Sequence, residues 1–225
     1  MSTQLMAQGL DGTQIDGGWF ADMQSFVRAT PWLHGSMVAC SDYGVVLVAV
    51  LMLGAWWLVR RADVVAMAAV LWAPIAVVLA YVVNSLMKNI FTEPRPCRAM
   101  PAVHTLLPCD PPTDWAFPSN HSAVVGAAAV ALLLAHRTLG LVATALALIV
   151  AFSRLYVGAH YPHDVLVGLA VGAVIGVLGI WVRRALAPLV MWLRGTPLAP
   201  LVTNIPAPTS TEMSDSHDGA DWGPQ

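Results

Sequence analysis

Residues 64–83 read VVAMAAVLWAPIAVVLAYVV, twenty residues in a row without a single charge. An α-helix rises 1.5 Å per residue, so a run of this length spans the roughly 30 Å hydrocarbon core of a bilayer. The stretch therefore predicts a transmembrane helix. Further apolar runs lie on either side of it, at Tyr43–Val59, Ser122–Ala135, Leu139–Tyr156 and Val165–Val182.

The run Ser122–Ala135 is short for a span unless it is extended to Ser119–His136. Without it the runs on either side would be badly connected, so we count five spans. Composition agrees with a membrane protein, because the 225 residues are 57% hydrophobic and only 11% charged, whereas soluble domains carry about 25% charged residues. The net charge of −2 and the lack of a basic stripe argue against a nucleic-acid partner.

An amphipathic segment precedes the first span. Its apolar residues recur at helical spacing, at Trp19, Phe20, Met23, Phe26 and Val27. Such a helix lies in the membrane interface or packs against the protein, and the pattern fits both. The sequence thus predicts an all-α polytopic membrane helical bundle with five transmembrane helices and an N-terminal interfacial amphipathic helix.

Basic residues predict the orientation of the bundle. Six of the eleven Lys and Arg residues fall on one side of the five spans, namely Arg60, Arg61, Arg137, Arg183, Arg184 and Arg194. By the positive-inside rule this side is cytoplasmic. The opposite, extracytoplasmic side of the plasma membrane then holds the N-terminus, the long loop 85–118 and the turn around Ala159.

Three polar clusters fall at the outer ends of the predicted spans. They are residues 88–96 (KNIFTEPRP), 118–121 (PSNH) and 153–164 (SRLYVGAHYPHD). They bring Lys88, Arg95 and Arg154 to one side of the bundle. Arginine forks match phosphate oxygens bidentately and lysine adds a compact charge. Ser119 stands where a helix N-cap would stand, and the free N–H groups of that helix could bind an anion. The clusters therefore predict a phosphate pocket.

Two histidines add chemistry to this pocket. Asp164 follows His160 by four residues, and Pro162 between them favours a helix start. Asp164 can then reach one ring nitrogen of His160, which leaves the other nitrogen free to attack phosphorus. His121 remains to protonate the leaving oxygen.

These clusters resemble the signature of the type-2 phosphatidic acid phosphatase (PAP2) superfamily, K-x6-RP, PSGH and SR-x5-H-x3-D. Matching residues are Lys88, Arg95, Pro96, Pro118, Ser119, His121, Ser153, Arg154, His160 and Asp164. The resemblance implies a phosphohistidine mechanism without metal or cofactor. His160 is then the nucleophile, Asp164 orients it and His121 is the general acid. Phosphate would be held by Lys88, Arg95, Ser119, Arg154 and the backbone N–H of Asn120.

Asn120 departs from the signature, because glycine is commonest at this position. Asparagine tolerates a positive φ better than most residues, so the pocket is expected to survive the change. The expected boundaries are a flexible N-terminus at 1–18, the interfacial helix at 19–34, the PAP2 domain at 35–187, and an interfacial segment with a disordered cytoplasmic tail at 188–225.

Small size, five spans and the stretch EPRP…VHTLLP…FPSNH resemble bacterial undecaprenyl pyrophosphate phosphatases of the bacitracin-resistance type. The resemblance implies a lipid phosphatase that hydrolyses a polyprenyl pyrophosphate to the monophosphate at the outer face. One alternative is another lipid phosphate, such as phosphatidic acid, phosphatidylglycerol phosphate or a polyprenyl-phosphoryl sugar phosphate. A non-enzymatic anion-binding protein or transporter is weaker, because it does not need His160 paired with Asp164.

Several residues outside the signature leave alternatives open. Glu93 could hold the Arg95 guanidinium or be solvated, and His163 is expected to face solvent. The stripe Gly168, Gly172 and Gly176 permits close helix packing, either within the bundle or at a dimer face. Three cysteines form no CxxC pair, which argues against a zinc or redox site. Cys97 and Cys109 share the outer loop and are predicted to form a disulfide, although two free thiols are the alternative.

Overall fold

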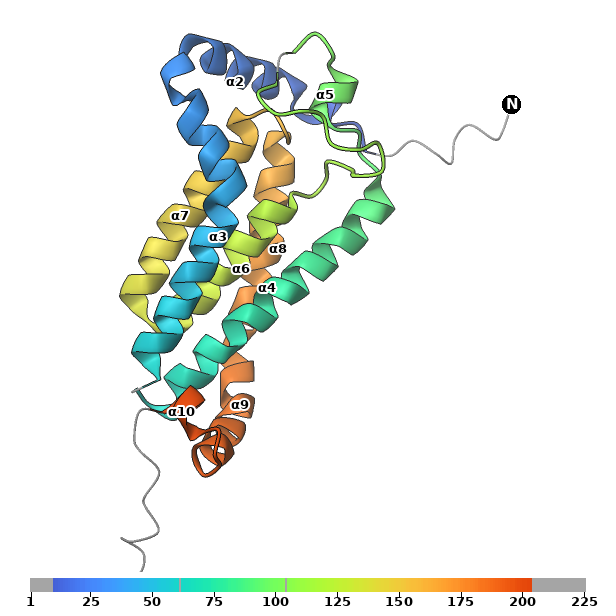
Figure 1. Ribbon diagram of the computed structural model, residues 1–225. Coiled ribbons are helices and arrows are strands. Elements are labelled where there is room, and N and C mark those ends of the chain that lie inside the picture. The colour runs from blue at the N-terminus through green and yellow to red at the C-terminus, as the bar shows by residue number, and fades with distance from the viewer. Residues whose placement is uncertain (1–9, 61, 104, 204–225) are drawn as a thin grey trace, which may run out of the picture.

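The computed structural model describes residues 10–60, 62–103 and 105–203, and over these residues it is helical without a strand. Figure 1 shows a bundle whose long helices run between a loop-rich end and an end formed by α9 and α10. The elements are α1 (Gly12–Ile15), α2 (Gly17–Ala29), η1 (Pro31–Leu33), α3 (His34–Val59), α4 (Val64–Phe91), α5 (Pro96–Ala99), α6 (Asn120–Ala135), α7 (Arg137–Tyr156), α8 (Pro162–Val177), α9 (Gly179–Arg194) and α10 (Ala199–Val202).

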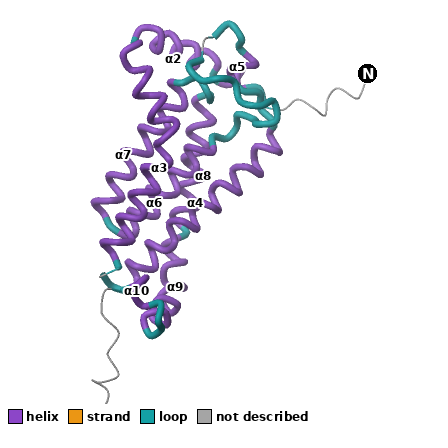
Figure 2. Tube along the Cα trace, viewed as in Figure 1, coloured by secondary structure: helices purple, strands orange, loops and turns teal. Residues whose placement is uncertain are grey.

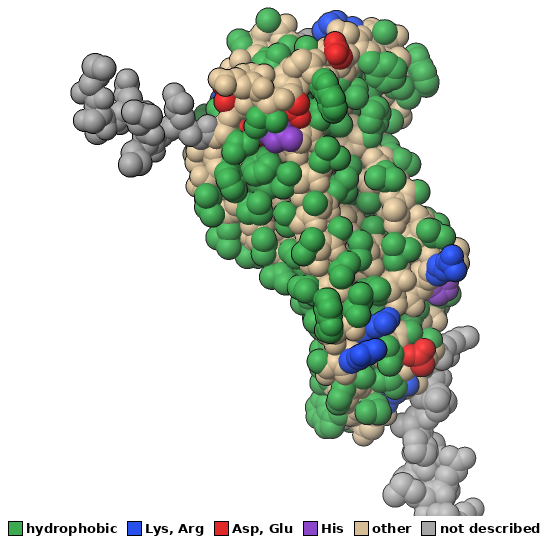
Figure 3. Space-filling view, turned by 180° about the vertical axis from the view of Figure 1, so that it is seen from behind, with side chains coloured by type: hydrophobic (Ala, Val, Ile, Leu, Met, Phe, Trp, Pro, Cys, Tyr) green, Lys and Arg blue, Asp and Glu red, His purple; other side chains and the backbone are tan. Residues whose placement is uncertain are grey.

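The centre of the bundle is α6, which packs against α4, α7 and α8. Its residues from Ser122 to Ala129 are buried without interruption. Six of its sixteen residues are alanine and one is glycine, so neighbouring helices approach its backbone closely. Hydrophobic side chains cover the surface around the middle of the molecule, while Lys and Arg gather mainly toward the α9 end (Figure 3). This is the surface of a protein embedded in a bilayer.

Three helical stretches are long and apolar enough to cross a membrane, Pro31–Val59, Val64–Ala99 and Arg137–Tyr156. The pair α8 and α9 counts as a fourth if it is one bent span. At 16 residues, α6 is shorter than a span, although its central position shields it from lipid. A membrane-embedded helical bundle is therefore established, and the count of five spans stays a prediction.

The fifth predicted span, Val165–Val182, is not one straight helix. α8 ends at Val177, and the axis turns by 40° into α9. Trp72 on α4 explains the bend, because its indole Nε1–H donates to the Gly176 carbonyl at 3.2 Å. A Cβ on Gly179 would lie 2.5 Å from the same indole. A side chain that takes a carbonyl from the helical ladder is a recognised cause of a kink.

The glycine stripe of α8 packs inside the bundle. A Cβ would lie 2.5 Å from the Ser119 carbonyl oxygen if placed on Gly168, and 2.1 Å from the Ala123 carbonyl oxygen if placed on Gly172. These obstacles are backbone atoms of α6 or of its N-cap. The stripe therefore joins α8 to α6, and this contact aligns the beginnings of the two helices.

The amphipathic N-terminal helix, α2, packs one face on the protein and exposes the other. Phe20 stacks edge-on against Tyr161 with ring centroids 5.3 Å apart, and Gln24 Nε2 donates to the Leu155 carbonyl at 3.2 Å. Trp19 and Phe26 remain exposed. Figure 2 shows α2 at the loop-rich end of the bundle, and we call α1 and α2 together the N-terminal arm. α2 thus packs against the turn that joins α7 to α8.

Several boundaries differ from the sequence prediction. α3 begins nine residues before Tyr43 and α4 continues to Phe91. α1 lies inside the segment 1–18 that was expected to be flexible, and Leu10 N–H donates to the Phe91 carbonyl at 3.0 Å. Residues 188–194 continue α9 beyond the expected domain end. The predictions for residues 1–9 and for the tail after 203 lie outside the described residues.

Candidate active site

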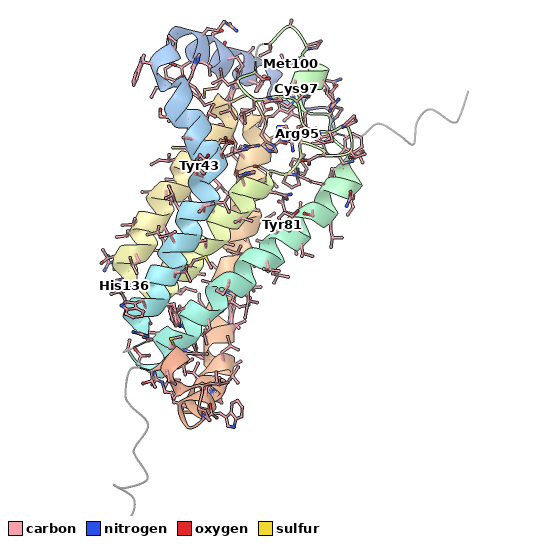
Figure 4. The ribbon with its side chains drawn as sticks, in the orientation of Figure 1. Tyr43, Tyr81, Arg95, Cys97, Met100 and His136 are labelled. Atoms are coloured by element: carbon pink, nitrogen blue, oxygen red, sulfur yellow. A yellow bond between two sulfur atoms is a disulfide. The ribbon has the colours of Figure 1, made fainter. Side chains whose placement is uncertain are left out.

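The three polar clusters meet at the loop-rich end of the bundle. Ser119 N–H donates to the Asp164 carbonyl at 3.0 Å, which ties the second cluster to the third. Asn84 on α4 donates from Nδ2 to the Pro118 carbonyl at 2.9 Å, which ties the same segment to the helix that carries Lys88. Figure 4 shows Arg95 at this end, level with the upper part of α3 that carries Tyr43.

His160 is the buried centre of the cluster. Its Nδ1 lies 3.3 Å from Asp164 Oδ2, and its Nε2 lies 3.3 Å from Arg95 Nη1. A guanidinium donates and cannot accept, so Nε2 must be the unprotonated nitrogen and Nδ1–H must donate to Asp164. Burial, together with the charges of Arg95 and Arg154, holds the pKa of His160 well below its usual range. The ring is therefore neutral, with its lone pair directed at the Arg95 guanidinium.

Two loop carboxylates hold the cations of the first cluster. Lys88 Nζ lies 2.8 Å from Asp114 Oδ1, and Arg95 Nη2 lies 2.8 Å from Asp114 Oδ2. Arg95 Nη1 also lies 3.0 Å from Asp110 Oδ2. Partial burial works against ionisation of Asp114, but the hydrogen bond from Lys88 and the charges of both cations lower its pKa overall. The charges of Lys88 and Arg95 are therefore paired with Asp110 and Asp114 in this structure.

Arg154 and His121 line a cavity of about 490 Å³, and Arg95, which contacts the buried His160, lines it too. Its other walls come from α3, from α5 with its N-cap and the loop after it, and from the α7–α8 turn. These residues are Asp42, Arg95, Cys97, Thr105, Leu107, Pro108, Cys109, Asp110, Pro111, Val157, Gly158 and Ala159. Arg154 donates from Nη1 to the hydroxyl of Ser41 on α3. The cavity thus has two arginines and one histidine on its wall, and one of these arginines, Arg95, contacts His160.

The N-terminus of α6 faces this region. Ser119 is the N-cap, and its hydroxyl accepts from Ser122 N–H at 3.5 Å. Asn120 begins the helix, and its side-chain oxygen accepts from Asn84 Nδ2 at 2.6 Å. Positive φ among non-glycine residues of the described chain occurs at Thr92 and not at Asn120. Position 120 therefore does not need a glycine conformation, and asparagine fits the site.

The predicted disulfide is confirmed, because Cys97 and Cys109 are bonded with Cα atoms 5.9 Å apart. Both cysteines line the cavity, and Cys97 lies two residues after Arg95. The bridge therefore closes the loop that presents Asp110 to Arg95.

The expectations for Glu93 and His163, which lie outside the signature, were both wrong. Glu93 is fully buried and its carboxylate faces His163, with Oε2 3.1 Å from Nε2, instead of Arg95 or solvent. His163 is largely buried and lies 3.3 Å from Asp164 Oδ1. Glu93, His163 and Asp164 form the group within the described chain whose spacing would suit a cation. Because His163 Nε2 already lies near Glu93 Oε2 and Asp164 Oδ1, and its Nδ1 lies 2.9 Å from Asp16 Oδ1, we assign no metal to this group.

Sequence reasoning missed the acidic partners of the site. Asp16, Asp110 and Asp114 lie in segments without helical periodicity, and nothing in their spacing links them to Arg95 or His163. Ser41 was overlooked because α3 begins earlier than its apolar run. A count of cations would have given one signal, since three buried cations at one end need counter-charges nearby.

A helical bundle in a bilayer that gathers three cations and a histidine–aspartate pair at one end has the architecture of a membrane phosphatase. The sequence profile of the PAP2 superfamily matches residues 69–187, a little over half of the chain. The chain belongs to the PAP2 superfamily.

Known relatives agree with this assignment. Undecaprenyl-diphosphatase BcrC of Bacillus subtilis is 35% identical over 158 residues, which cover 70% of this chain and 79% of the relative. An undecaprenyl-diphosphatase of Sulfolobus acidocaldarius is 30% identical over 152 residues, or 67% of this chain and 71% of the relative. Among solved structures, LpxE of Aquifex aeolicus has a TM-score of 0.58 at 22% identity and covers 74% of this chain and 95% of its own. The last likeness concerns the fold alone.

Proposed function

We propose that this protein is a metal-independent lipid phosphatase that converts a polyprenyl pyrophosphate to the monophosphate at the outer face of the plasma membrane. The observation that carries the proposal is the state of His160, whose unprotonated Nε2 faces the Arg95 guanidinium within a cationic site. A transporter would need the cations but not a nucleophile oriented by Asp164. The names of the two relatives support a pyrophosphate as the substrate.

The chemistry follows from the geometry. The terminal phosphate exchanges with the carboxylates of Asp110 and Asp114 and binds Lys88, Arg95 and Arg154. The Nε2 lone pair of His160 attacks the terminal phosphorus, and the bond from that phosphorus to the bridging oxygen breaks.

In the free protein, burial and the charges of Arg154, Arg95 and Lys88 lower the pKa of His121 to about 4. The bound pyrophosphate offsets these charges, so His121, at the wall of the cavity, takes up a proton from solvent and gives it to the bridging oxygen as the lipid monophosphate leaves. Water then attacks the phosphohistidine while His121 takes a proton from it. This second step releases inorganic phosphate and restores neutral His160. Ser119 and the backbone N–H of Asn120 support the phosphate from the N-terminus of α6.

The membrane face rests on the basic residues of the sequence. Arg60 and Arg137 lie at the ends of α3 and α7 remote from the cavity, where the positive-inside rule puts the cytoplasm. His160 and its loops then lie on the extracytoplasmic side.

Phosphate release from purified protein tests the proposal, with undecaprenyl pyrophosphate, phosphatidic acid and phosphatidylglycerol phosphate compared side by side. We expect the highest kcat/KM for the pyrophosphate, no turnover in His160→Gln, and an alkali-stable phosphoprotein whose label maps to the peptide of His160. Preference for a monoester would move the assignment to another lipid phosphate. Turnover in His160→Gln would exclude the phosphohistidine route.

A further inference from the structure

The histidine next to Asp164 has an environment that the mechanism does not use. His163 Nδ1 lies 2.9 Å from Asp16 Oδ1, and Nε2 lies 3.1 Å from Glu93 Oε2. Both ring nitrogens thus face carboxylate oxygens. A neutral imidazole has one N–H, whereas an imidazolium donates from both nitrogens. A ring with a carboxylate at each nitrogen therefore fits the charged form of histidine.

Charge balance points the same way. Three carboxylates converge on this ring, because Asp164 Oδ1 also lies 3.3 Å from Nε2. Glu93 and Asp164 are fully buried. Two buried carboxylates side by side cannot both stay ionised without a compensating cation. His163 is the cation that contacts both of them.

Aromatic rings favour a positive charge at this position. His163 stacks on Phe117 with centroids 5.6 Å apart, and on Tyr161 with centroids 5.8 Å apart. The faces of aromatic rings attract cations. The ring is thus surrounded by carboxylates and aromatic faces. These come from the N-terminal arm, from the α4–α5 connection, from the segment before α6, and from α8 with its N-cap.

The N-terminal arm holds this arrangement closed. Asp16 Oδ2 also accepts a hydrogen bond from the backbone N–H of His163 at 2.8 Å, in addition to the contact of Asp16 Oδ1 with the ring. A Cβ on Gly12 would lie 2.0 Å from Glu93 Oε1, so the arm passes directly over the buried carboxylate. The arm therefore supplies one charge partner and excludes water from another.

We propose that His163, held as an imidazolium between Asp16 and Glu93, is a positioning residue that keeps Asp164 ionised and aimed at Nδ1 of His160. The inference rests on the proposed function, since it assigns the support of the same histidine–aspartate pair. Without the cation, Glu93 and Asp164 share a proton, and the protonated Asp164 no longer stabilises the charge that develops on His160 during attack.

The first test compares His163→Gln with the double variant His163→Gln/Glu93→Gln. We expect kcat of the single variant to fall roughly tenfold or more at pH 7, with the acidic limb of its pH profile about one unit higher. KM should change little, because His163 does not line the cavity. The double variant loses one carboxylate together with the cation, so it should recover most of the lost kcat.

A purely structural role gives a different pattern. The single variant would then lose activity equally at every pH, and the double variant, with two lesions, would be worse. Either that pattern or a wild-type profile in His163→Gln overturns the proposal. His136→Asn is the matched control, because His136 caps α7 at the opposite end of the bundle (Figure 4) and asparagine keeps a capping acceptor.

A second measurement does not depend on turnover. Nitrogen NMR of protein labelled at its histidines, in detergent micelles at pH 8, identifies His163 as the signal missing from the His163→Gln spectrum. We expect the imidazolium pattern, with both nitrogens protonated, and its loss in Asp16→Asn. A neutral pattern for His163 overturns this proposal, whether or not the protein hydrolyses a lipid phosphate. A wild-type protein that hydrolyses no lipid phosphate would overturn the proposed function instead.

Discussion

Replacing Gly172 with alanine tests the contact that aligns the two halves of the site. The new Cβ would lie 2.1 Å from the Ala123 carbonyl oxygen and 2.7 Å from the Ala127 nitrogen. Backbone atoms cannot rotate away, so α8 must move off α6 by roughly 1 Å. Overpacking of this kind costs about 1–3 kcal/mol, and we expect the upper half of that range because the obstacle is main chain.

The same displacement should reach the catalytic end. Ser119 N–H and the Asp164 carbonyl are joined at 3.0 Å, so separating α6 from α8 pulls the two clusters apart. A misplacement of about 1 Å can lower activity on the order of 100-fold. The assays are the free energy of unfolding by SDS titration in mixed micelles, and kcat/KM.

Gly54→Ala is the control for this experiment. Among the described residues, nothing lies within 4 Å of a Cβ at Gly54 on α3, so alanine there should add about 0.5–1 kcal/mol of helix stability. If Gly172→Ala unfolds like the wild type and keeps its activity, α6 and α8 do not pack as closely as described. If instead it alters the oligomeric state without destabilising the monomer, the stripe is a dimer face.

Three further predictions concern proton binding, metal and topology. His160 has a lowered pKa in the folded protein, so its contribution to stability is present above the unfolded pKa near 6.5 and is lost below it. Between pH 6.5 and 5 the unfolding free energy should therefore drop by up to about 1.4 kcal/mol per pH unit, and this slope should be smaller in His160→Gln. EDTA should leave phosphatase activity unchanged; strong inactivation that added metal reverses would contradict the metal-free mechanism. In a Cys40→Ser background, Thr113→Cys should react with a membrane-impermeant thiol reagent in intact cells and Ala62→Cys should not, whereas the opposite labelling would put the site in the cytoplasm.

Much of the site could be predicted because its chemistry requires particular residue types at fixed spacing. An arginine or lysine for phosphate, a histidine as nucleophile and an aspartate one helical turn later are recognisable in one dimension, as at His160 and Asp164. The disulfide was predictable for a similar reason, since Cys97 and Cys109 share one loop. The catalytic roles of His160 and Asp164 are proposals.

Tertiary contacts between distant segments were not predictable in this way. Asp16 meets His163 across 147 positions of sequence, and no local pattern marks either residue for the other. The bend after α8 depends on Trp72 from another helix, which reads as an ordinary apolar residue in its own run. Hydropathy also says little about α6, because a helix enclosed by its neighbours does not have to match the bilayer thickness.

The position of Asp16 has a consequence for biosynthesis. Asp16 leaves the ribosome before His163, which follows 147 residues later, and at usual elongation rates this takes roughly 7–30 s. Until α8 is inserted, Asp16 has no imidazolium to bind and the carboxylate of Glu93 has no cation. The pocket is therefore completed only when the N-terminal arm and the start of α8 meet, so a chain stalled after α7 would already carry Lys88, Arg95 and His121 and still lack His160, the proposed nucleophile.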